Sequence, residues 1–565
     1  MARPILLLGA CAFALMISMV SSSVVEHTFT VANQTLKRLC SEQEVTLVNG
    51  EMPGPVIEVE DGDTLIVHVL NQSPLYISFH WHGLFQRRSG WADGAANITQ
   101  CAIAPGTNYT YQFNITGQHG TLWWHSHRSL LRSTMYGAFI IHPNSAYPFP
   151  KPDKAFPIIF GEWWNGSVVT IDNQGTFAGT GPALSDAFTI NGKPGHLYPC
   201  PEIYKTETHN LTVTPGKTYL LRIINAALNH QLFFKIAGHN FTVVAVDAGY
   251  TDPYVTDVVL SGPGQTVDVL LVANQTPKSY YMAIQGYNSA GPTTPFLNKT
   301  ATAILVYENS TSSVPEMPVL PPFNDTPTAF TFYSNLTSLT NSVTNVPLQV
   351  DVQMFITIGM SVTPCATCNV PGQKGVRLSA NMNGKSFQLP TNISILQAFF
   401  TGATGVYTED FPTQPLLAFD YTNSTKLLNQ TQFVLTQKST SVKRIPFNSS
   451  VEIVLQNTAI ITVESHPMHL HGYDFYVMAM GFGNYNATED VKKFNYFNPQ
   501  KRNTVAVPAG GWAVIRFRAD NPGTWIIHCH LETHLEFGLA TVLIVDEGPT
   551  PFYKLPPPPS DYPQC

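Results

Sequence analysis

Charged residues are scarce in this chain, and those present do not cluster. Only 12% of the 565 residues are charged, whereas 44% are hydrophobic, a balance typical of a globular protein and not of a disordered one. Lys and Arg form no run or stripe, and the net charge is −7. The sequence therefore predicts neither a nucleic-acid partner nor electrostatic docking on an anionic membrane.

Long hydrophobic runs are missing too, with one exception at the N-terminus. Arg3 precedes an apolar stretch from Ile5 to Val20, which is followed by three serines. About 16 apolar residues are short for a membrane span, so we interpret residues 1–23 as a secretory signal peptide. An N-terminal membrane anchor is the alternative. We expect a secreted protein of the extracellular space that makes no membrane contact.

Cysteine is sparse, and its number is informative. Eight cysteines occur, and Cys11 lies within the signal peptide, which leaves seven. An odd number in a secreted protein indicates one thiol with a role outside disulfide bonding. About 18 Asn-x-Ser/Thr sequons, from Asn33 to Asn486, agree with secretion and predict a glycoprotein.

Convincing helical periodicity is rare, whereas strand and turn signals recur throughout. The 43 prolines and 39 glycines favour short strands and turns over long helices. Apolar or alternating runs bounded by turn residues read as strands, and their spacing indicates sandwiches or barrels. We therefore predict an all-β fold, with strands that include Val56–Glu60, Thr64–Leu70, Gly137–His142, Lys217–Ile224, Thr266–Ala273, Val451–Gln456, Trp512–Arg518 and Leu539–Val545.

Changes in composition divide the chain into three related β-domains. Proline-rich residues 143–157 and the Ser-, Pro- and Asn-dense residues 309–327 mark the breaks, and residues 365–368 fall in a loop-like region. A faint repeat supports the division, because similar turn sequences precede the strands that begin near Thr64 and Lys217. The expected domains are residues 24–145, 156–308 and 346–565, with a linker at 309–345 and a C-terminal tail.

Four His-x-His pairs are the main signal of function. Residues two apart on a strand project from the same face, roughly 6–7 Å apart, so the members of a pair can serve two neighbouring metal ions. Four such pairs, each beside a hydrophobic strand, are hard to explain as packing. Imidazole suits copper, and the eight residues predict a copper cluster. They are His80, His82, His125, His127, His469, His471, His528 and His530.

A second group of candidate ligands surrounds the odd cysteine. Cys529 stands between His528 and His530, so on a strand its thiol points to the opposite face. His466 lies three residues before His469, so on a strand it also faces away from the His469/His471 pair. A helical turn after His530 would bring His534 alongside Cys529. One thiolate and two imidazoles suit a blue-copper site for electron transfer. The chain from Cys529 to its two neighbours would then carry electrons to the cluster.

Two other interpretations are weaker. Catalytic zinc takes about three protein ligands, so ten histidines and one cysteine are too many for a zinc hydrolase. A lone histidine is usually solvated or paired in a core, which is how we interpret the other eight. These are His27, His68, His119, His142, His196, His209, His230 and His239.

The motifs around these residues resemble those of the multicopper oxidases, in particular the plant laccases. They are His80-Trp81-His82-Gly83, Trp123-Trp124-His125-Ser126-His127, His466-Pro467-Met468-His469-Leu470-His471-Gly472 and His528-Cys529-His530-Leu531-Glu532-Thr533-His534. The resemblance extends over essentially the whole mature chain. It implies three cupredoxin-like Greek-key β-barrel domains that bind four copper ions.

The resemblance also assigns the ligands. It implies a type 1 blue copper at His466, Cys529 and His534, and a type 2 copper at His80 and His469. The paired type 3 coppers would take His82, His125, His127, His471, His528 and His530. The axial position of the blue copper falls on Leu539, which cannot coordinate, and loss of a donor there should raise the reduction potential.

Further roles follow from the same resemblance. Asp93 is the candidate acid that supplies protons for cleavage of the O–O bond, although it could simply form a turn, and Glu532 and Glu536 are weaker candidates. Fungal laccases place an aspartate beside the phenol, where this chain has Asn229, so a neutral hydrogen bond would replace the carboxylate. The phenol is expected at a shallow site near His466.

The implied reaction is one-electron oxidation of phenols coupled to reduction of dioxygen to water. Monolignols or flavonoids would be the substrates, and polymerisation of lignin or other phenolics in the apoplast or cell wall would be the outcome. A monomer is expected. Alternatives are an ascorbate oxidase or ferroxidase on the same fold, or a non-catalytic copper-binding wall glycoprotein.

Six cysteines remain after Cys529, and all should pair in an oxidising compartment. Their connectivity does not follow from the sequence, because six cysteines allow 15 arrangements. Resemblance to the family implies Cys101–Cys565, Cys40–Cys200 and Cys365–Cys368. The first pair would fasten the C-terminal tail to the first domain.

Overall fold

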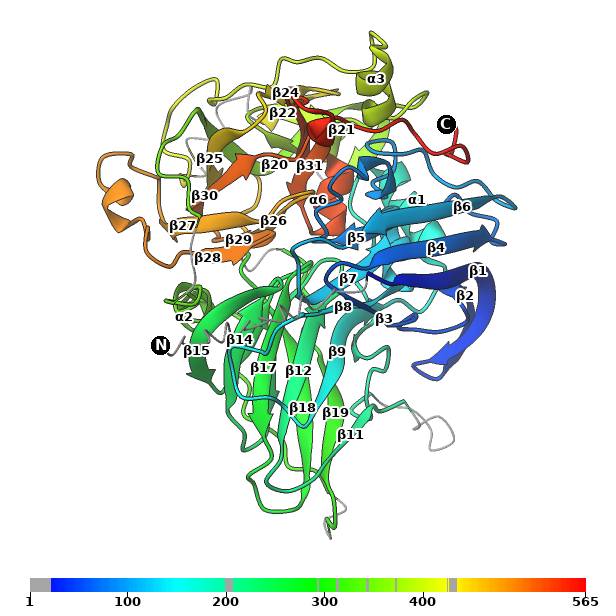
Figure 1. Cartoon of the computed structure of the whole chain (residues 1–565), viewed down its shortest axis with the longest axis vertical. Coiled ribbons are helices and arrows are strands. Elements are labelled where there is room, and N and C mark those ends of the chain that lie inside the picture. The colour runs from blue at the N-terminus through cyan, green and yellow to red at the C-terminus, as the bar shows by residue number, and fades with distance from the viewer. Residues whose placement is uncertain are drawn as a thin grey trace, which may run out of the picture.

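A computed structural model describes residues 22–198, 207–291, 294–310, 314–341, 345–370, 373–423, 425 and 434–565. Nearly all of the expected signal peptide lies outside these ranges. Within them, strands dominate and form six sheets that pair into three sandwich-like units, here called the first, second and third barrels (Figure 1). The expected all-β fold class is confirmed.

The first barrel consists of two four-stranded sheets. One contains, in spatial order, β2 (Ser41–Val48), β1 (Val24–Arg38), β4 (Thr64–Asn71) and β6 (Asn108–Asn114). The other contains β3 (Ile57–Glu60), β8 (Tyr136–His142), β7 (Gly120–Ser126) and β5 (Phe79–His82).

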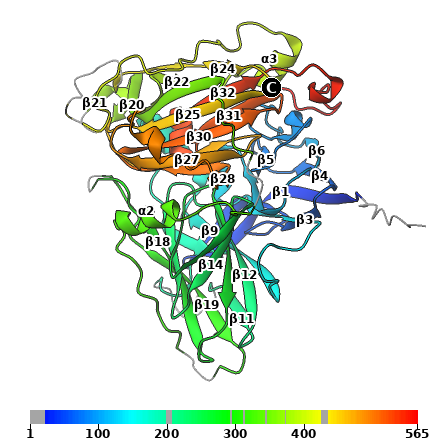
Figure 2. The same cartoon turned by 60° about the vertical axis from the view of Figure 1, so that its left-hand side comes forward.

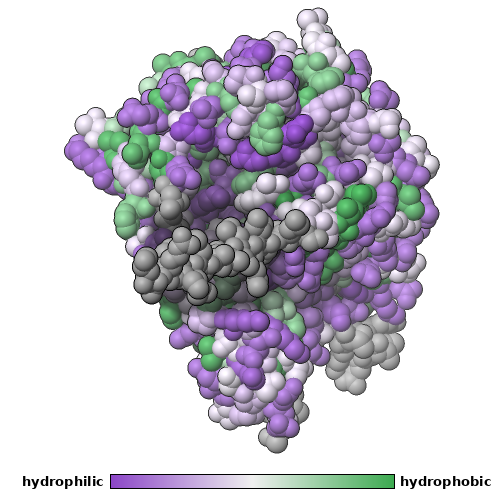
Figure 3. Space-filling model, viewed as in Figure 1, coloured by the Kyte–Doolittle hydropathy of each residue, from purple (hydrophilic) through white to green (hydrophobic). Residues whose placement is uncertain are grey.

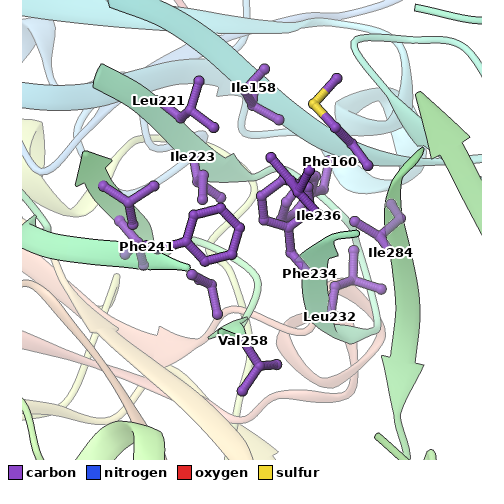
Figure 4. Packing of buried hydrophobic residues seen from close by; sticks show 14 of the residues in the cluster. Ile158, Phe160, Leu221, Ile223, Leu232, Phe234, Ile236, Phe241, Val258 and Ile284 are labelled. Carbon is purple, nitrogen blue, oxygen red and sulfur yellow. The ribbon is translucent and has the colours of Figure 1, made fainter. Parts of the chain in front are cut away.

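The second barrel combines a six-stranded with a five-stranded sheet. The larger has the order β10 (Ala187–Ile190), β9 (Lys154–Trp163), β12 (Thr218–Asn225), β17 (Thr266–Val272), β14 (Phe241–Val246) and β15 (Gly249–Thr256). The smaller has β11 (Asn210–Val213), β19 (Thr300–Tyr307), β18 (Ser279–Tyr287), β13 (Gln231–Ile236) and β16 (Val259–Ser261). Between them Phe160, Phe234 and Phe241 pack with aliphatic side chains in a fully buried core (Figure 4).

The third barrel is the largest and has sheets of eight and five strands. The first runs β23 (Gln437–Ser439), β22 (Lys385–Phe387), β21 (Gln373–Met382), β20 (Val352–Val370), β25 (Ser449–Asn457), β30 (Gly511–Ala519), β27 (Phe475–Phe482) and β28 (Gln500–Arg502). The second runs β24 (Val442–Ile445), β32 (Ala540–Val545), β31 (Gly523–Cys529), β26 (His466–Leu470) and β29 (Thr504–Val507).

Local sequence pattern explains which strands reach the interior. In β4 apolar residues alternate with half-exposed ones, because one face packs on the core and the other faces solvent. By contrast, every residue of β5, β7, β26 and β31 is buried. These four strands carry or adjoin the His-x-His pairs, so the pairs lie inside the molecule.

The eight strands expected from the sequence all coincide with observed strands. One local expectation is wrong. Residues 365–368 belong to β20, but the pairing of β20 with β21 shifts between Pro364 and Asn369, so these residues leave the ladder as an irregularity. The limits of the three domains stay a prediction, although the breaks between barrels follow His142 and Tyr307.

Helices are short and few in the described ranges. The α-helices are α1 (Val168–Ala178), α2 (Thr326–Ser334), α3 (Ile395–Thr401) and α6 (Glu532–Phe537), and the 3-10 turns are η1 (Gly90–Ala92), η2 (Ser129–Ser133), η4 (Asp490–Lys493) and η5 (Pro551–Tyr553). In two views the first and third barrels lie side by side above the second, and α6 lies near their junction in the first of these (Figures 1 and 2).

The surface carries hydrophobic side chains only in small groups on the face shown in Figure 3, where hydrophilic side chains separate them. None of the helices in the described part of the chain has the length and apolar character needed to cross a bilayer.

Candidate metal centre

The four His-x-His pairs meet between the first and third barrels. His80 on β5 stacks on His471, with ring centroids 3.8 Å apart, and His82 stacks on His469 at 3.7 Å. His125 and His528 join from β7 and β31. Seven of the eight residues are at most 1% exposed, and His127 alone is half-buried. All eight predicted residues are therefore brought together.

Backbone carbonyls orient four of these eight rings. Nδ1 of His80 donates to the carbonyl oxygen of Asp93 at 2.8 Å, and Nδ1 of His469 donates to that of Asn503 at 2.8 Å. Nδ1 of His125 and of His528 each contact the carbonyl of the next residue at 2.9 Å. The opposite nitrogen, Nε2, is thereby directed into the cluster as a lone-pair donor.

Four of the inward nitrogens lack ordinary partners. Nε2 of His80, His125, His127 and His469 is buried and has no hydrogen-bond partner among the described residues. Buried polar atoms without a partner are rare in folded proteins, and here they converge. In sets of three, the ligand atoms lie within 4.8 Å of one another, as in His80 with His82 and His125. The donor set fits metal ions.

His82 is turned the other way. Its Nε2 contacts the side chains of Asn503 and Thr504, both at 3.1 Å, and its Nδ1 lies 3.1 Å from Nε2 of His530. His471 and His528 likewise face each other through Nε2 atoms 3.2 Å apart. Two such nitrogen pairs within the cluster suit a binuclear site.

The environment favours the neutral form of His82, His469, His471 and His528. Burial, together with neighbouring imidazoles, lowers the pKa of His82, His469 and His471 well below the ordinary value. Burial also lowers the pKa of His528 to about 3. Neutral imidazole is the form that binds metal, so no proton competes at physiological pH.

A separate group of ligands surrounds Cys529. Its Sγ lies 3.6 Å from Nδ1 of both His466 and His534, and these two nitrogens are 3.1 Å apart. Cys529 is the free cysteine of the described part of the chain and is fully buried. Helix α6 turns the chain back after β31 and so places His534. One thiolate and two imidazoles form the ligand set of a blue-copper site.

Leu539 closes the same region from the C-terminal side of α6. Cys529 N donates to its carbonyl at 3.0 Å, and its own N–H donates to the carbonyl of His534 at 2.9 Å. The side chain is 0% exposed and packs in the same core cluster as Cys529. The assignment of Leu539 to the axial position of the blue copper stays a prediction.

Asp93 contacts two cluster histidines. Its carboxylate oxygens lie 3.0 and 3.2 Å from Nδ1 of His471, and its carbonyl accepts from His80. Thr99 donates to the same carboxylate at 3.3 Å, and Asp93 is 0% exposed. Asp93 thus orients ligands of both barrels.

The carboxylate of Glu464 lies at the edge of the blue-copper ligands. Glu464 Oε1 lies 3.3 Å from Nε2 of His534. His534 is 6% exposed and His466 is 1% exposed, so the more accessible edge belongs to His534 and not to His466. Proximity of Glu464 to His466 in the sequence was the available signal, but only the fold shows which imidazole it meets.

Asn229 lies beside this edge. Its Oδ1 accepts from the backbone N–H of Thr533 at 3.3 Å and from the Thr533 hydroxyl at 2.9 Å. A backbone N–H can only donate, so the amide orientation is fixed and Nδ2 points away from Thr533. Nδ2 makes no hydrogen bond within the described residues.

Glu532 and Glu536, the weaker acid candidates, lie on α6. Glu532 pairs with Arg132 at 3.0 Å, and Arg132 Nη1 lies 3.1 Å from Nδ1 of His530. Burial raises the pKa of Glu532 to about 7, against the lowering effect of Arg132. Burial, Glu532 and Asp172 raise the pKa of Glu536 to about 9.

Disulfides join Cys101 to Cys565 and Cys365 to Cys368. Cys40 is also disulfide-bonded, and its expected partner Cys200 lies outside the described residues.

The remaining histidines belong to none of the metal-binding groups of the described residues. His230 pairs with Glu162, and His239 contacts Tyr307. His68 and His142 contact the carboxylates of Glu26 and Glu58.

Three family models, each described as multicopper oxidase, match residues 30–146, 154–310 and 410–549. The chain belongs to the multicopper oxidase family. Similar solved structures include a laccase from Botrytis aclada, 28% identical with a TM-score of 0.71 over 93% of this chain and 88% of that one. Fet3p, a multicopper oxidase that functions in iron import, is 24% identical with a TM-score of 0.71 over 93% of this chain and 90% of its own.

Relatives that match over nearly their whole length are plant laccases. Laccase-7 of Arabidopsis thaliana is 53% identical over 98% of this chain and 99% of its own length. Laccase-24 of Oryza sativa subsp. japonica is 51% identical over 99% of both. The three cupredoxin-like domains, the oxidoreductase class and copper as the cofactor, expected from the sequence, are thereby confirmed.

Proposed function

We propose that this chain is a secreted laccase that oxidises phenols one electron at a time and reduces dioxygen to water. The observation that supports this proposal is a covalent connection between the two groups of ligands. Cys529, 3.6 Å from both His466 and His534, is bonded through the backbone to His528 and His530 of the histidine cluster. An electron accepted at the Cys529 group can therefore reach the histidine cluster through the backbone that joins Cys529 to its two neighbours.

The ligand assignments follow from this arrangement. His466, Cys529 and His534 would hold a type 1 blue copper, and His80 and His469 would hold the type 2 ion. The paired type 3 ions would take His82, His125, His127, His471, His528 and His530. Bound copper supplies one-electron redox chemistry, because it cycles between Cu(I) and Cu(II).

The balance of the reaction is simple. Four phenols each lose one electron and one proton and become phenoxyl radicals, while one dioxygen takes up the four electrons and four protons and becomes two waters. The radicals then couple without the enzyme. Asp93, held between His80 and His471, is the residue proposed to deliver protons to oxygen at the cluster.

The phenol would bind at the edge of His534 between two groups of opposite character. Glu464 presents an acceptor 3.3 Å from Nε2 of His534, where a phenolic hydroxyl can donate. Asn229 presents Nδ2 as a donor, suited to an oxygen substituent next to that hydroxyl. Phenols with neighbouring oxygen groups, such as monolignols and many flavonoids, fit this pair.

The cellular setting is the apoplast or cell wall, with polymerisation or turnover of lignin and other phenolics as the outcome. The apolar stretch at residues 5–20 and the many sequons support secretion, although not every sequon can carry a glycan. Asn71 is 1% exposed and its Nδ2 donates to the carbonyl of Leu75 at 2.8 Å. We propose a monomer that binds neither nucleic acid nor membrane.

Oxygen consumption by the pure copper-loaded protein tests the proposal. Monolignols, a flavonoid, ascorbate and ferrous iron would be compared at equal concentration. Fastest uptake with a phenol is the expected result. Fastest uptake with ferrous iron would instead assign Glu464 to an iron site and make the chain a ferroxidase, and uptake with none would refute an oxidase function.

A further inference from the structure

Glu162 of β9 is buried beneath the edge where the phenol is proposed to bind. It is 0% exposed, and its carboxylate accepts four hydrogen bonds. Oε2 receives the backbone N–H groups of Leu228 and Asn229 at 2.7 and 2.8 Å, while Oε1 receives the Ser185 hydroxyl at 2.7 Å and Nδ1 of His230 at 2.6 Å. The Glu162 carboxylate therefore holds the loop of the second barrel that contains residues 228–230.

That loop reaches the blue-copper ligands of the third barrel. The carbonyl of Leu228 accepts from the N–H of Glu532 at 3.0 Å, and Asn229 Oδ1 accepts from Thr533. Glu532 and Thr533 directly precede His534 in the chain. Two successive residues of the loop therefore hold two successive residues of α6.

From these contacts we propose that Glu162 is a positioning residue for phenol binding. It fixes residues 228 and 229, and in this way it directs Asn229 Nδ2. The inference rests on the proposed function, because the phenol is what Asn229 would meet.

The ionised form of Glu162 suits this task. Burial alone would raise its pKa, but His230 and the hydrogen bonds from Ser185 and Asn229 lower the pKa below the ordinary value. Other contacts also hold the loop, since Ala226 N donates to the carbonyl of Phe160 at 2.9 Å and Asn225 Nδ2 donates to that of Ser261 at 2.7 Å. Replacement of Glu162 should therefore disturb the loop locally and leave the barrel folded.

Two substitutions of similar size separate positioning from packing. Glu162→Gln keeps an acceptor oxygen for the N–H groups of Leu228 and Asn229, whereas Glu162→Met keeps only the volume. In copper-loaded protein we expect Glu162→Met to raise KM for 2,6-dimethoxyphenol about tenfold, the value of roughly one hydrogen bond. Glu162→Gln should stay within about twofold of the wild type.

Ferrocyanide is the comparison substrate, since it donates an electron without a phenolic hydroxyl or an adjacent oxygen group. Its KM should change less than about twofold in Glu162→Met, and blue absorbance and copper content should be retained. Glu452→Met is the matched control. It removes another buried carboxylate, paired with Arg516 at 2.7 Å in the third barrel, and should lower stability while leaving phenol KM unchanged.

A double variant tests the route of action. In an Asn229→Ala background, Glu162→Met should add little to phenol KM, because the donor it positions is already gone. Additive effects, equal rises in KM for both donors, or identical behaviour of Glu162→Met and Glu162→Gln would overturn the inference. If the wild type oxidises no phenol, the proposed function is refuted, and the inference that rests on it is refuted as well.

Discussion

Cys529 on β31 lies directly opposite Met468 on β26, and the adjacent pair in this register is His528 opposite His469. Because side chains alternate along a strand, Cys529 and Met468 face one side of the sheet, as does His466, while His528 and His469 face the other. A single pair of strands thus forms parts of both metal-binding groups. The two metal-binding groups are connected directly, because the adjacent residues His528 and Cys529 belong to different groups.

Replacement of Cys529 by serine should uncouple these two sides. Serine lacks the thiolate that gives blue copper its colour, so we expect loss of the blue absorption and of phenol turnover. The histidine cluster on the opposite face should keep three of the four copper ions. Metal analysis and the visible spectrum of the purified variant check this, and a variant that stays blue would refute the ligand assignment.

The axial position offers a graded test. Leu539→Met would place a thioether beside the thiolate and stabilise the oxidised ion, so the reduction potential should fall. We expect a decrease on the order of 59 mV, the equivalent of tenfold in a one-electron equilibrium. Redox titration measures it directly. Leu539→Ile serves as the control without a sulfur, and a potential unchanged in both variants would remove Leu539 from the axial role.

Asp93 should act on the cluster and not on the blue site. Asp93→Asn keeps the shape but weakens the contact with Nδ1 of His471, so we expect copper affinity of the cluster or the rate of oxygen reduction to fall about 10–100-fold. Blue absorption should persist and should bleach normally with phenol under argon. Asp63→Asn, at another buried aspartate of the first barrel, should alter neither property.

Much of the metal centre could be predicted from the sequence because its signals are local. The spacing of each His-x-His pair, the parity of Cys529 and the helical turn before His534 all concern residues within a few positions of one another. The register of β26 with β31 and the position of α6 agree with that reasoning. Strand positions were equally accessible, since apolar alternation is also a local pattern.

The supporting contacts could not be predicted, because they join distant parts of the chain. Glu162 meets residues 66 and 67 positions away, and Asp93 meets His471 across two barrels. Glu464 was visible next to His466, yet its partner is His534. Residues 365–368 belong to β20 and not to a loop, which the sequence could not show because a disulfide within an irregular strand has the same small, polar composition as a loop.

The disulfide between Cys101 and Cys565 should protect the cluster as well as the fold. It fastens the C-terminal tail to the segment that carries Asp93, and the same tail donates from the Tyr562 hydroxyl to the carbonyl of Thr99 at 3.0 Å. Cys565→Ser should therefore cost about 2–4 kcal/mol of stability. We also expect the variant to lose cluster copper to a chelator faster than the wild type, with the blue copper less affected. The double replacement of Cys365 and Cys368 by serine is the control, since it opens only a short local loop far from Asp93 in sequence. If both variants lost cluster copper at the same rate, the tail would have no specific role in holding Asp93.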